Sequence, residues 1–203
     1  MFSIKTLAAI LTLGVLTACA TTSATGPAAT ARFDDFQVVM TSDFTGYQSV
    51  YLAPITVSEE IRERIGFRRL NIADRTRPLS ESDINRKSED LAEDLRRAIS
   101  AKANLVNAPG PSILTIEVML TELQANRPTL EEINDNVGLS LQSRYEGGAG
   151  ASLTFKENGA VLATARDTQI RNLDPLNFPE AIWRDADQFF VNLANKTADL
   201  LGS

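Results

Sequence analysis

The most unusual local feature of this 203-residue chain is a set of arginines between Glu59 and Arg77. Six arginines and four acids give this segment a net charge of +2, whereas the whole chain carries −6. Guanidinium groups donate paired hydrogen bonds to phosphates and carboxylates. The candidate residues for binding an anion or an acidic partner are Arg62, Arg64, Arg68 and Arg69. Alternatively, the arginines pair with neighbouring acids on an irregular, solvated segment over residues 58–79, at little energetic consequence.

Two pairs of neighbouring acids offer acid–base chemistry in principle, Glu131 with Glu132 and Asp185 with Asp187. Side chains one or two positions apart on a helix do not face each other, so these pairs are poorly placed to share a proton. We expect both pairs to be solvated.

A glycine-rich run, Gly147-Gly148-Ala149-Gly150, invites comparison with a phosphate-binding loop. It lacks the Gly-Lys-Ser/Thr ending of such loops and opens a predicted strand instead of a helix. The run therefore predicts a turn or a close approach between backbones.

The chain has no histidine and a single cysteine, Cys19. Without histidine it lacks the commonest general base and the commonest metal ligand. Together the two counts exclude Ser-His-Asp triads, Cys-His dyads, zinc sites of the Cys/His type and intramolecular disulfides. An acidic chain also has no electrostatic basis for binding nucleic acid. We therefore predict a protein that is not an enzyme and binds neither metal nor nucleic acid.

Two stretches before the predicted hairpin have strand patterns. Residues 49–57 are rich in β-branched and aromatic side chains, and Pro54 indicates either a sheet edge or a bulge there. Residues Ser112–Gln124 alternate, with one face uniformly apolar and the other mixed. The mixed face carries Ile113 and Met119, and partly apolar exposed sheets mark partner surfaces. These two residues are a candidate interface, unless segment 58–79 or 125–141 covers them.

A hairpin is predicted around Asn158-Gly159, the strongest two-residue turn signal. It joins strands over residues 151–157 and 160–168. A regular ladder around this turn places Phe155 opposite Leu162.

Two amphipathic helices are predicted. The first starts after Ser80, an N-cap residue, and continues through Ile99. The second closes the chain from Ile182 to Leu200. Residues 125–141 are polar and predict a long loop. These elements predict an α/β (α+β) fold, a two-layer sandwich of a mainly antiparallel sheet with both helices on one face.

Cys19 ends an apolar run from Leu7 to Leu16 that follows a basic residue, Lys5. The run is too short to cross a bilayer and has the features of a cleaved export signal. With Leu16-Thr17-Ala18-Cys19 as a lipobox, this segment resembles a bacterial lipoprotein signal peptide. The resemblance implies cleavage before Cys19 and attachment of a diacylglycerol and an N-acyl chain to it, with no other cofactor.

The same resemblance divides the chain into three segments. Residues 1–18 are the signal peptide, residues 19–32 a lipidated tether, and residues 33–203 a single periplasmic α/β domain. The uncharged, small residues of the tether predict a flexible chain with a reach of about 20 Å. In Gram-negative lipoproteins an aspartate after the cysteine favours the inner membrane, and this chain has Ala20 there. The resemblance therefore implies an outer-membrane anchor facing the periplasm.

Three further segments strengthen the resemblance: Val50-Tyr-Leu-Ala-Pro54, Leu114-Thr-Ile-Glu-Val118 and Gly148-Ala-Gly-Ala-Ser-Leu-Thr-Phe155. In this order, behind a lipobox, they are similar to an uncharacterised family of Gram-negative lipoproteins. That family has no catalytic residues to transfer to this chain.

The leading functional hypothesis is a non-enzymatic envelope binding or assembly factor that contacts the membrane through its lipid anchor. One alternative is an auxiliary lipoprotein subunit of an envelope transporter or secretion complex, with an envelope protein complex as its partner. A third hypothesis is a carboxylate-dependent envelope hydrolase.

Overall fold

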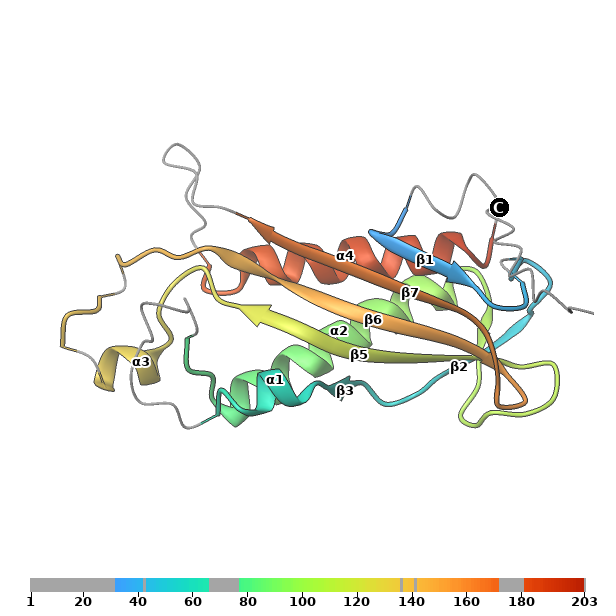
Figure 1. The fold of residues 1–203 in the computed structure, drawn as a ribbon, viewed down its shortest axis with the longest axis horizontal. Coiled ribbons are helices and arrows are strands. Elements are labelled where there is room, and N and C mark those ends of the chain that lie inside the picture. Colours follow the sequence, from blue (N-terminus) through green and yellow to red (C-terminus); the bar gives the residue numbers. More distant parts are fainter. Residues whose placement is uncertain are drawn as a thin grey trace, which may run out of the picture.

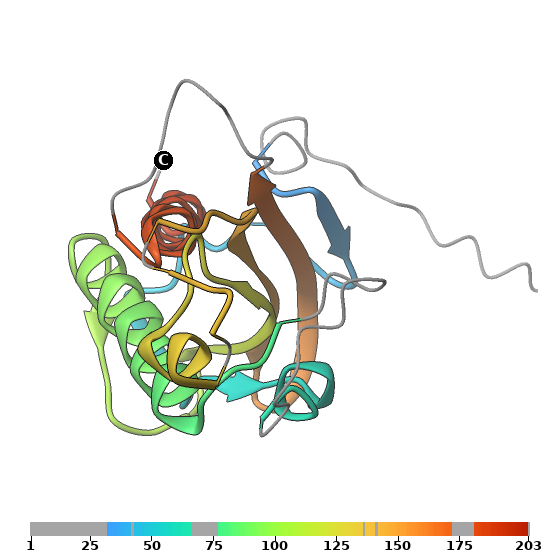
Figure 2. The same cartoon turned by 90° about the vertical axis from the view of Figure 1, so that its left-hand side faces the viewer.

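The computed structural model describes residues 32–41, 43–65, 77–135, 137–140, 142–171 and 181–202. The strands in these residues are β1 (Asp35–Val38), β2 (Ser49–Leu52), β3 (Thr56–Val57), β4 (Asn104–Leu105), β5 (Leu114–Gln124), β6 (Gly147–Glu157) and β7 (Ala160–Arg171). The helices are α1 (Glu59–Arg62), α2 (Glu81–Ser100), α3 (Leu130–Asp135) and α4 (Arg184–Asp199). The long helices α2 and α4 lie together on one face of the sheet (Figures 1 and 2). The predicted two-layer α+β sandwich is confirmed.

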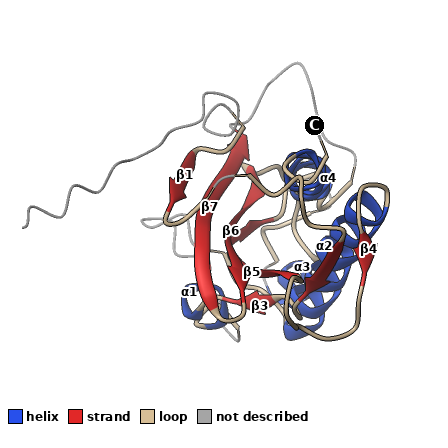
Figure 3. Ribbon diagram, turned by 90° about the vertical axis from the view of Figure 1, so that its right-hand side faces the viewer, coloured by secondary structure: helices blue, strands red, loops and turns tan. Residues whose placement is uncertain are grey.

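The strands form one mixed sheet in the order β1-β7-β6-β5-β2-β4, and β3 also pairs with β5. The long strands β5, β6 and β7 pair antiparallel, as does β1 with β7. The short strands β2, β3 and β4 add only parallel pairs. Figure 3 shows β1 and β4 near opposite margins of the sheet. The strand β1, which the sequence pattern did not predict, covers part of the edge of β7.

The strand predicted over residues 49–57 is divided in two by Pro54. The first part, β2, lies inside the sheet between β4 and β5, and the second part, β3, pairs only with β5. Proline has no N–H to donate to a ladder. The interruption therefore falls where the sequence indicated one.

The alternation predicted for β5 is present, with one irregularity. Its apolar positions from Leu114 to Leu120 are buried under the helices. The ladder to β6 shifts between Leu120 and Glu122, so Thr121 is an extra residue. The shift turns Leu123 into the core, where it is fully buried.

The predicted hairpin forms, and both turn residues adopt positive φ, with 48° at Asn158 and 81° at Gly159. The predicted register is wrong by one residue, because Phe155 lies opposite Ala163 and not Leu162. Leu162 is an extra residue in β7, and its carbonyl accepts hydrogen bonds from the backbone of the chain that follows β1. The bulge therefore joins the hairpin to β1.

Helix α2 begins as predicted, because the Ser80 side chain accepts a hydrogen bond from the Asp83 N–H at 3.0 Å. Helices α2 and α4 run parallel. Lys87 near the start of α2 contacts Asp187 near the start of α4, and Lys102 beyond the end of α2 donates to the carbonyl of Gly202. Both helices therefore begin at the same end of the molecule.

The two segments predicted to be irregular each contain a short helix. Helix α1 lies within residues 58–79, and α3 lies within residues 125–141. Within the described ranges, no helix is both long enough and apolar enough to cross a membrane.

Candidate binding cleft at the starts of three helices

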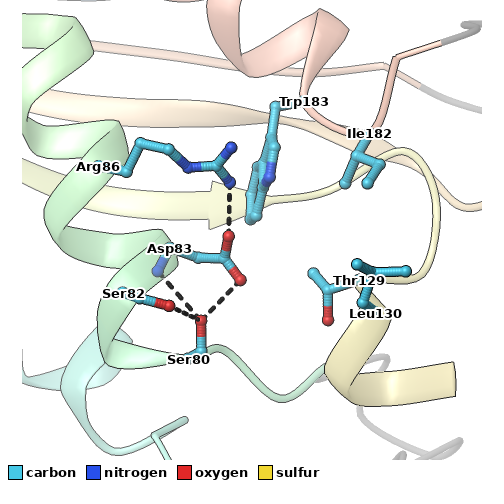
Figure 4. A pocket seen from close by; sticks show the side chains of 8 residues that line it. All are labelled: Ser80, Ser82, Asp83, Arg86, Thr129, Leu130, Ile182 and Trp183. Atoms are coloured by element: carbon cyan, nitrogen blue, oxygen red, sulfur yellow. Dashed lines mark hydrogen bonds and ion pairs between the residues drawn. The ribbon is translucent and has the colours of Figure 1, made fainter. Parts of the chain in front are cut away.

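A cleft of about 440 Å³ opens where α2, α3 and α4 begin (Figure 4). Small-molecule sites have volumes in this range. Three segments that are distant in the sequence form its walls. The lining residues are Ser80, Ser82, Asp83 and Arg86 at the start of α2, Thr129 and Leu130 at the start of α3, and Ile182 and Trp183 before α4.

On the α2 wall, the polar side chains form hydrogen bonds with one another. The Ser80 hydroxyl donates to Asp83 Oδ2 at 2.7 Å and lies 3.0 Å from the hydroxyl of Ser82. Asp83 Oδ1 accepts from Arg86 at 2.5 Å. The carboxylate and the guanidinium therefore neutralise each other, although the Arg86 side chain is 55% exposed.

The opposite wall contains an unsatisfied hydrogen-bond donor. Trp183 is only 4% exposed, and its indole nitrogen, Nε1, is buried without a hydrogen-bond partner. Figure 4 shows this nitrogen on the ring edge that faces Ile182 and Thr129. A buried donor without a partner costs about 1–3 kcal/mol. A ligand that reached this N–H with an acceptor atom would recover part of that cost.

Lys87 lies next to Trp183 and links α2 to α4. Its side chain is 5% exposed, and its ammonium pairs with Asp90 at 2.5 Å and with Asp187 at 2.6 Å. The ammonium also lies 6.0 Å from the centroid of the Trp183 ring. The cross-helix ion pair therefore holds α2 and α4 together next to the tryptophan.

The α3 wall is fixed by a capping box, Thr129-x-x-Glu132. The Thr129 hydroxyl accepts from the backbone N–H of Glu132 at 3.3 Å, and the Glu132 carboxylate accepts from the backbone N–H of Thr129 at 2.7 Å. The same carboxylate binds the Arg77 guanidinium through two bonds of 3.1 and 2.6 Å. This ion pair therefore positions the part of the cleft that carries Thr129.

Arg77 is buried and its guanidinium is fully engaged. Besides Glu132, it donates to the carbonyls of Ala125 and Arg127. The ring of Tyr145 lies over it at 3.9 Å. Burial raises the pKa of the Tyr145 phenol, while the charge of Arg77 acts in the opposite direction. Arg77 therefore has a structural role, because its guanidinium joins these groups in the interior.

The predicted anion-binding arginines do not form one site. Arg64 is buried at 8% exposure and donates to the carbonyls of Arg77 and Leu123, each at 2.8 Å. Burial lowers its pKa. Arg64 therefore braces the interior and is not available to an external anion. Arg62 is exposed and donates to the carbonyl of Val57, while Arg68 and Arg69 lie outside the described residues.

The expectation that the paired acids are solvated is wrong for one member of each pair. Glu132 is 2% exposed and bound to Arg77, and Asp185 is 6% exposed. The Asn126 side chain makes two hydrogen bonds with Asp185: its amide nitrogen donates to the carboxylate, and its oxygen accepts from the backbone N–H. Both acids are therefore structural.

The candidate interface residues differ in their surroundings. Met119 is 39% exposed in β5, where it lies opposite Ser152 of β6. Ile113 is half-buried in the turn before β5, where its N–H donates to the carbonyl of Gly110 at 3.2 Å. Of the two, Met119 offers the more exposed apolar surface.

No family model matches the sequence, and no curated protein matches it. Among solved structures, the chain is similar to the PelC dodecamer from Paraburkholderia phytofirmans in two crystal forms. Identity is 12% in both, TM-scores are 0.45 and 0.41, and the match covers 83% of this chain and 97% or 99% of that one.

It is also similar to protein XCC0632 from Xanthomonas campestris (DUF330), with 10% identity, a TM-score of 0.43, and coverage of 79% and 89%. A homolog of the neuraminyllactose-binding hemagglutinin from Helicobacter pylori has 10% identity, a TM-score of 0.38, and coverage of 81% and 88%. These likenesses are loose and identify no residue of the cleft.

Proposed function

We propose that this protein is a lipid-anchored, periplasm-facing binding protein of the outer membrane that performs no catalysis. Its anchor is Cys19, followed by a flexible tether and a single α+β domain over residues 33–203. Its ligand occupies the cleft at the starts of α2, α3 and α4.

The observation that carries the proposal is the indole N–H of Trp183. It is buried without a partner in the wall of a cleft of about 440 Å³. Native proteins rarely leave a buried donor unsatisfied, and such exceptions call for an explanation. A bound ligand with an acceptor atom explains this one.

The acids near the cleft support a binding role more than a catalytic one. Asp83 is held by Arg86 and Ser80, and Glu132 is held by Arg77 and Thr129. General acids and bases need a proton that can move at the working pH. The oxygens of both carboxylates are already engaged by these neighbouring groups, so neither acid is well placed to exchange a proton with a ligand.

Photo-crosslinking in living cells tests the proposal. A photoreactive residue at Leu130, which is 67% exposed on the cleft rim, should give an adduct. The same residue at Val191, which is 40% exposed on α4 outside the cleft, is the matched control. Adducts from neither position, or equal adducts from both, would contradict the proposal.

The exposed side chain of Met119 favours a second candidate, an auxiliary subunit of an envelope transporter or secretion complex. In that case a crosslinker at Met119 or Arg68 gives one abundant protein adduct, and a crosslinker at Leu130 gives none.

The lipid anchor has a separate test: Cys19→Ala should abolish both acyl labelling and membrane attachment. Labelling that persists in this variant would refute lipidation at Cys19.

A further inference from the structure

We infer that the cleft takes a neutral, hydroxylated ligand of about the size of one sugar unit. This inference rests on the proposed binding function and specifies its ligand. It follows from the charge balance of the walls, from their hydrogen-bonding groups and from their apolar rim.

The charge balance disfavours ionic ligands. The charged side chains that line the cleft are Asp83 and Arg86, which form an ion pair at 2.5 Å. Behind the walls, Glu132 is paired with Arg77, and Lys87 is paired with two aspartates. A ligand anion would lie beside the Asp83 carboxylate, and a ligand cation would lie beside Arg86. Either one would face a like charge.

The hydrogen-bonding groups require a ligand that both accepts and donates. Trp183 supplies a donor only, so the ligand needs an acceptor oxygen. Asp83 supplies acceptors, and the hydroxyls of Ser80, Ser82 and Thr129 supply both kinds of group. A sugar hydroxyl also donates and accepts, so one ring can satisfy both walls.

The apolar part of the cleft fits the carbon face of such a ring. Ile182 and Leu130 lie on the side opposite the serines (Figure 4). Leu130 is 67% exposed although it is large and apolar. Covering this side chain would therefore add favourable apolar burial to the polar contacts.

Trp183 is the only tryptophan of the chain, so its fluorescence reports on the cleft alone. The probes are glucose, glucuronate and glucosamine, which share one ring and differ in charge. In a titration of the full lipidated chain in detergent, glucose should change the Trp183 emission saturably. Glucuronate and glucosamine should bind at least about tenfold more weakly.

Two pairs of variants make the test specific. Leu130→Ala should weaken glucose binding several-fold, whereas Val191→Ala should leave it unchanged. Arg86→Ala exposes the Asp83 carboxylate and should tighten glucosamine binding. Arg97→Ala removes an arginine from α2 that also pairs with neighbouring acids, and it should have no effect.

The outcomes separate this inference from the proposed function. If glucuronate or glucosamine binds more tightly than glucose, the inference is wrong and the cleft is still a binding site. The same holds if no sugar changes the emission but a crosslinker at Leu130 gives an adduct. If there is neither an emission change nor an adduct, the unpaired N–H binds ordered water only, and both proposals fail.

Discussion

Replacing Glu132 with glutamine removes a carboxylate that binds the buried Arg77 guanidinium. Glu132 is 2% exposed and binds Arg77 through two hydrogen bonds. Its carboxylate also accepts from the Thr129 backbone and completes the capping box of α3. Glutamine keeps the size of the side chain and removes its charge. Because the amide has one acceptor oxygen in place of two, the variant removes the charge of the pair together with the hydrogen bonds that one oxygen accepts.

Removing one partner of a buried ion pair costs about 3–5 kcal/mol, because the other charge stays buried and uncompensated. Arg77 keeps the carbonyls of Ala125 and Arg127 and the ring of Tyr145. We therefore expect the lower end of that range, about 3 kcal/mol. With a urea m-value of about 2 kcal/mol/M, the midpoint of unfolding should fall by about 1.5 M.

Urea unfolding followed by circular dichroism measures this change at a constant m-value. Glu93→Gln is the matched control, because Glu93 pairs with Arg97 on the exposed face of α2. Exposed pairs contribute about 0–1 kcal/mol, so this variant should unfold near the wild-type midpoint. If Glu132→Gln lowers the free energy of unfolding by less than about 1 kcal/mol, the buried pair does not stabilise the wall of the cleft.

Three further variants test the local structure. Ser80→Ala removes the N-cap of α2 and should lower the free energy of unfolding by about 1 kcal/mol in urea. Gly148→Ala should lower the melting temperature strongly, because φ is +152° and an added Cβ would lie 1.9 Å from the carbonyl oxygen of Gln169. Tyr47→Phe tests alkaline stability: burial and the hydrogen bond to Glu157 raise the pKa of Tyr47 to about 12, above its ordinary value of 10.0. Since the folded-state pKa is raised, this contribution is fully present below pH 10 and is lost as the pH rises towards 12. Unfolding midpoints measured across that range should change less with pH in the variant, and equal slopes would contradict the assignment.

The sequence predicted the elements in which a periodic pattern of apolar residues extends over many positions. Helix α2 was predicted because its stripe of apolar residues continues for several turns, and it begins at the predicted cap, Ser80. The hairpin turn was also predicted, but its register was not. A single extra residue, Leu162, shifts the ladder close to the turn, and the sequence on either side of the bulge does not reveal it. The short elements β1 and α3 were missed because they contain too few residues to show a periodic pattern of apolar positions.

The candidate site could be predicted only in part. The capping box Thr129-x-x-Glu132 is visible in the sequence and would have indicated α3. The burial of Arg64 and Arg77 is not visible there, because their partners include backbone carbonyls beyond residue 120 and a glutamate 55 positions away from Arg77. Arginines that bind an external anion and arginines that brace an interior look alike in a sequence. The cleft itself joins three distant segments and depends on the parallel packing of α2 and α4.

Whether the Trp183 N–H belongs to a ligand site is tested most directly by crosslinking from position 130, in cells that carry either the natural chain or Trp183→Phe. The variant keeps an aromatic ring and removes the indole N–H. We predict an adduct in the natural chain, at a yield that falls several-fold in the variant while membrane attachment through Cys19 is unchanged. An equal yield in both chains would contradict a role for that N–H, and no adduct in either would contradict the site.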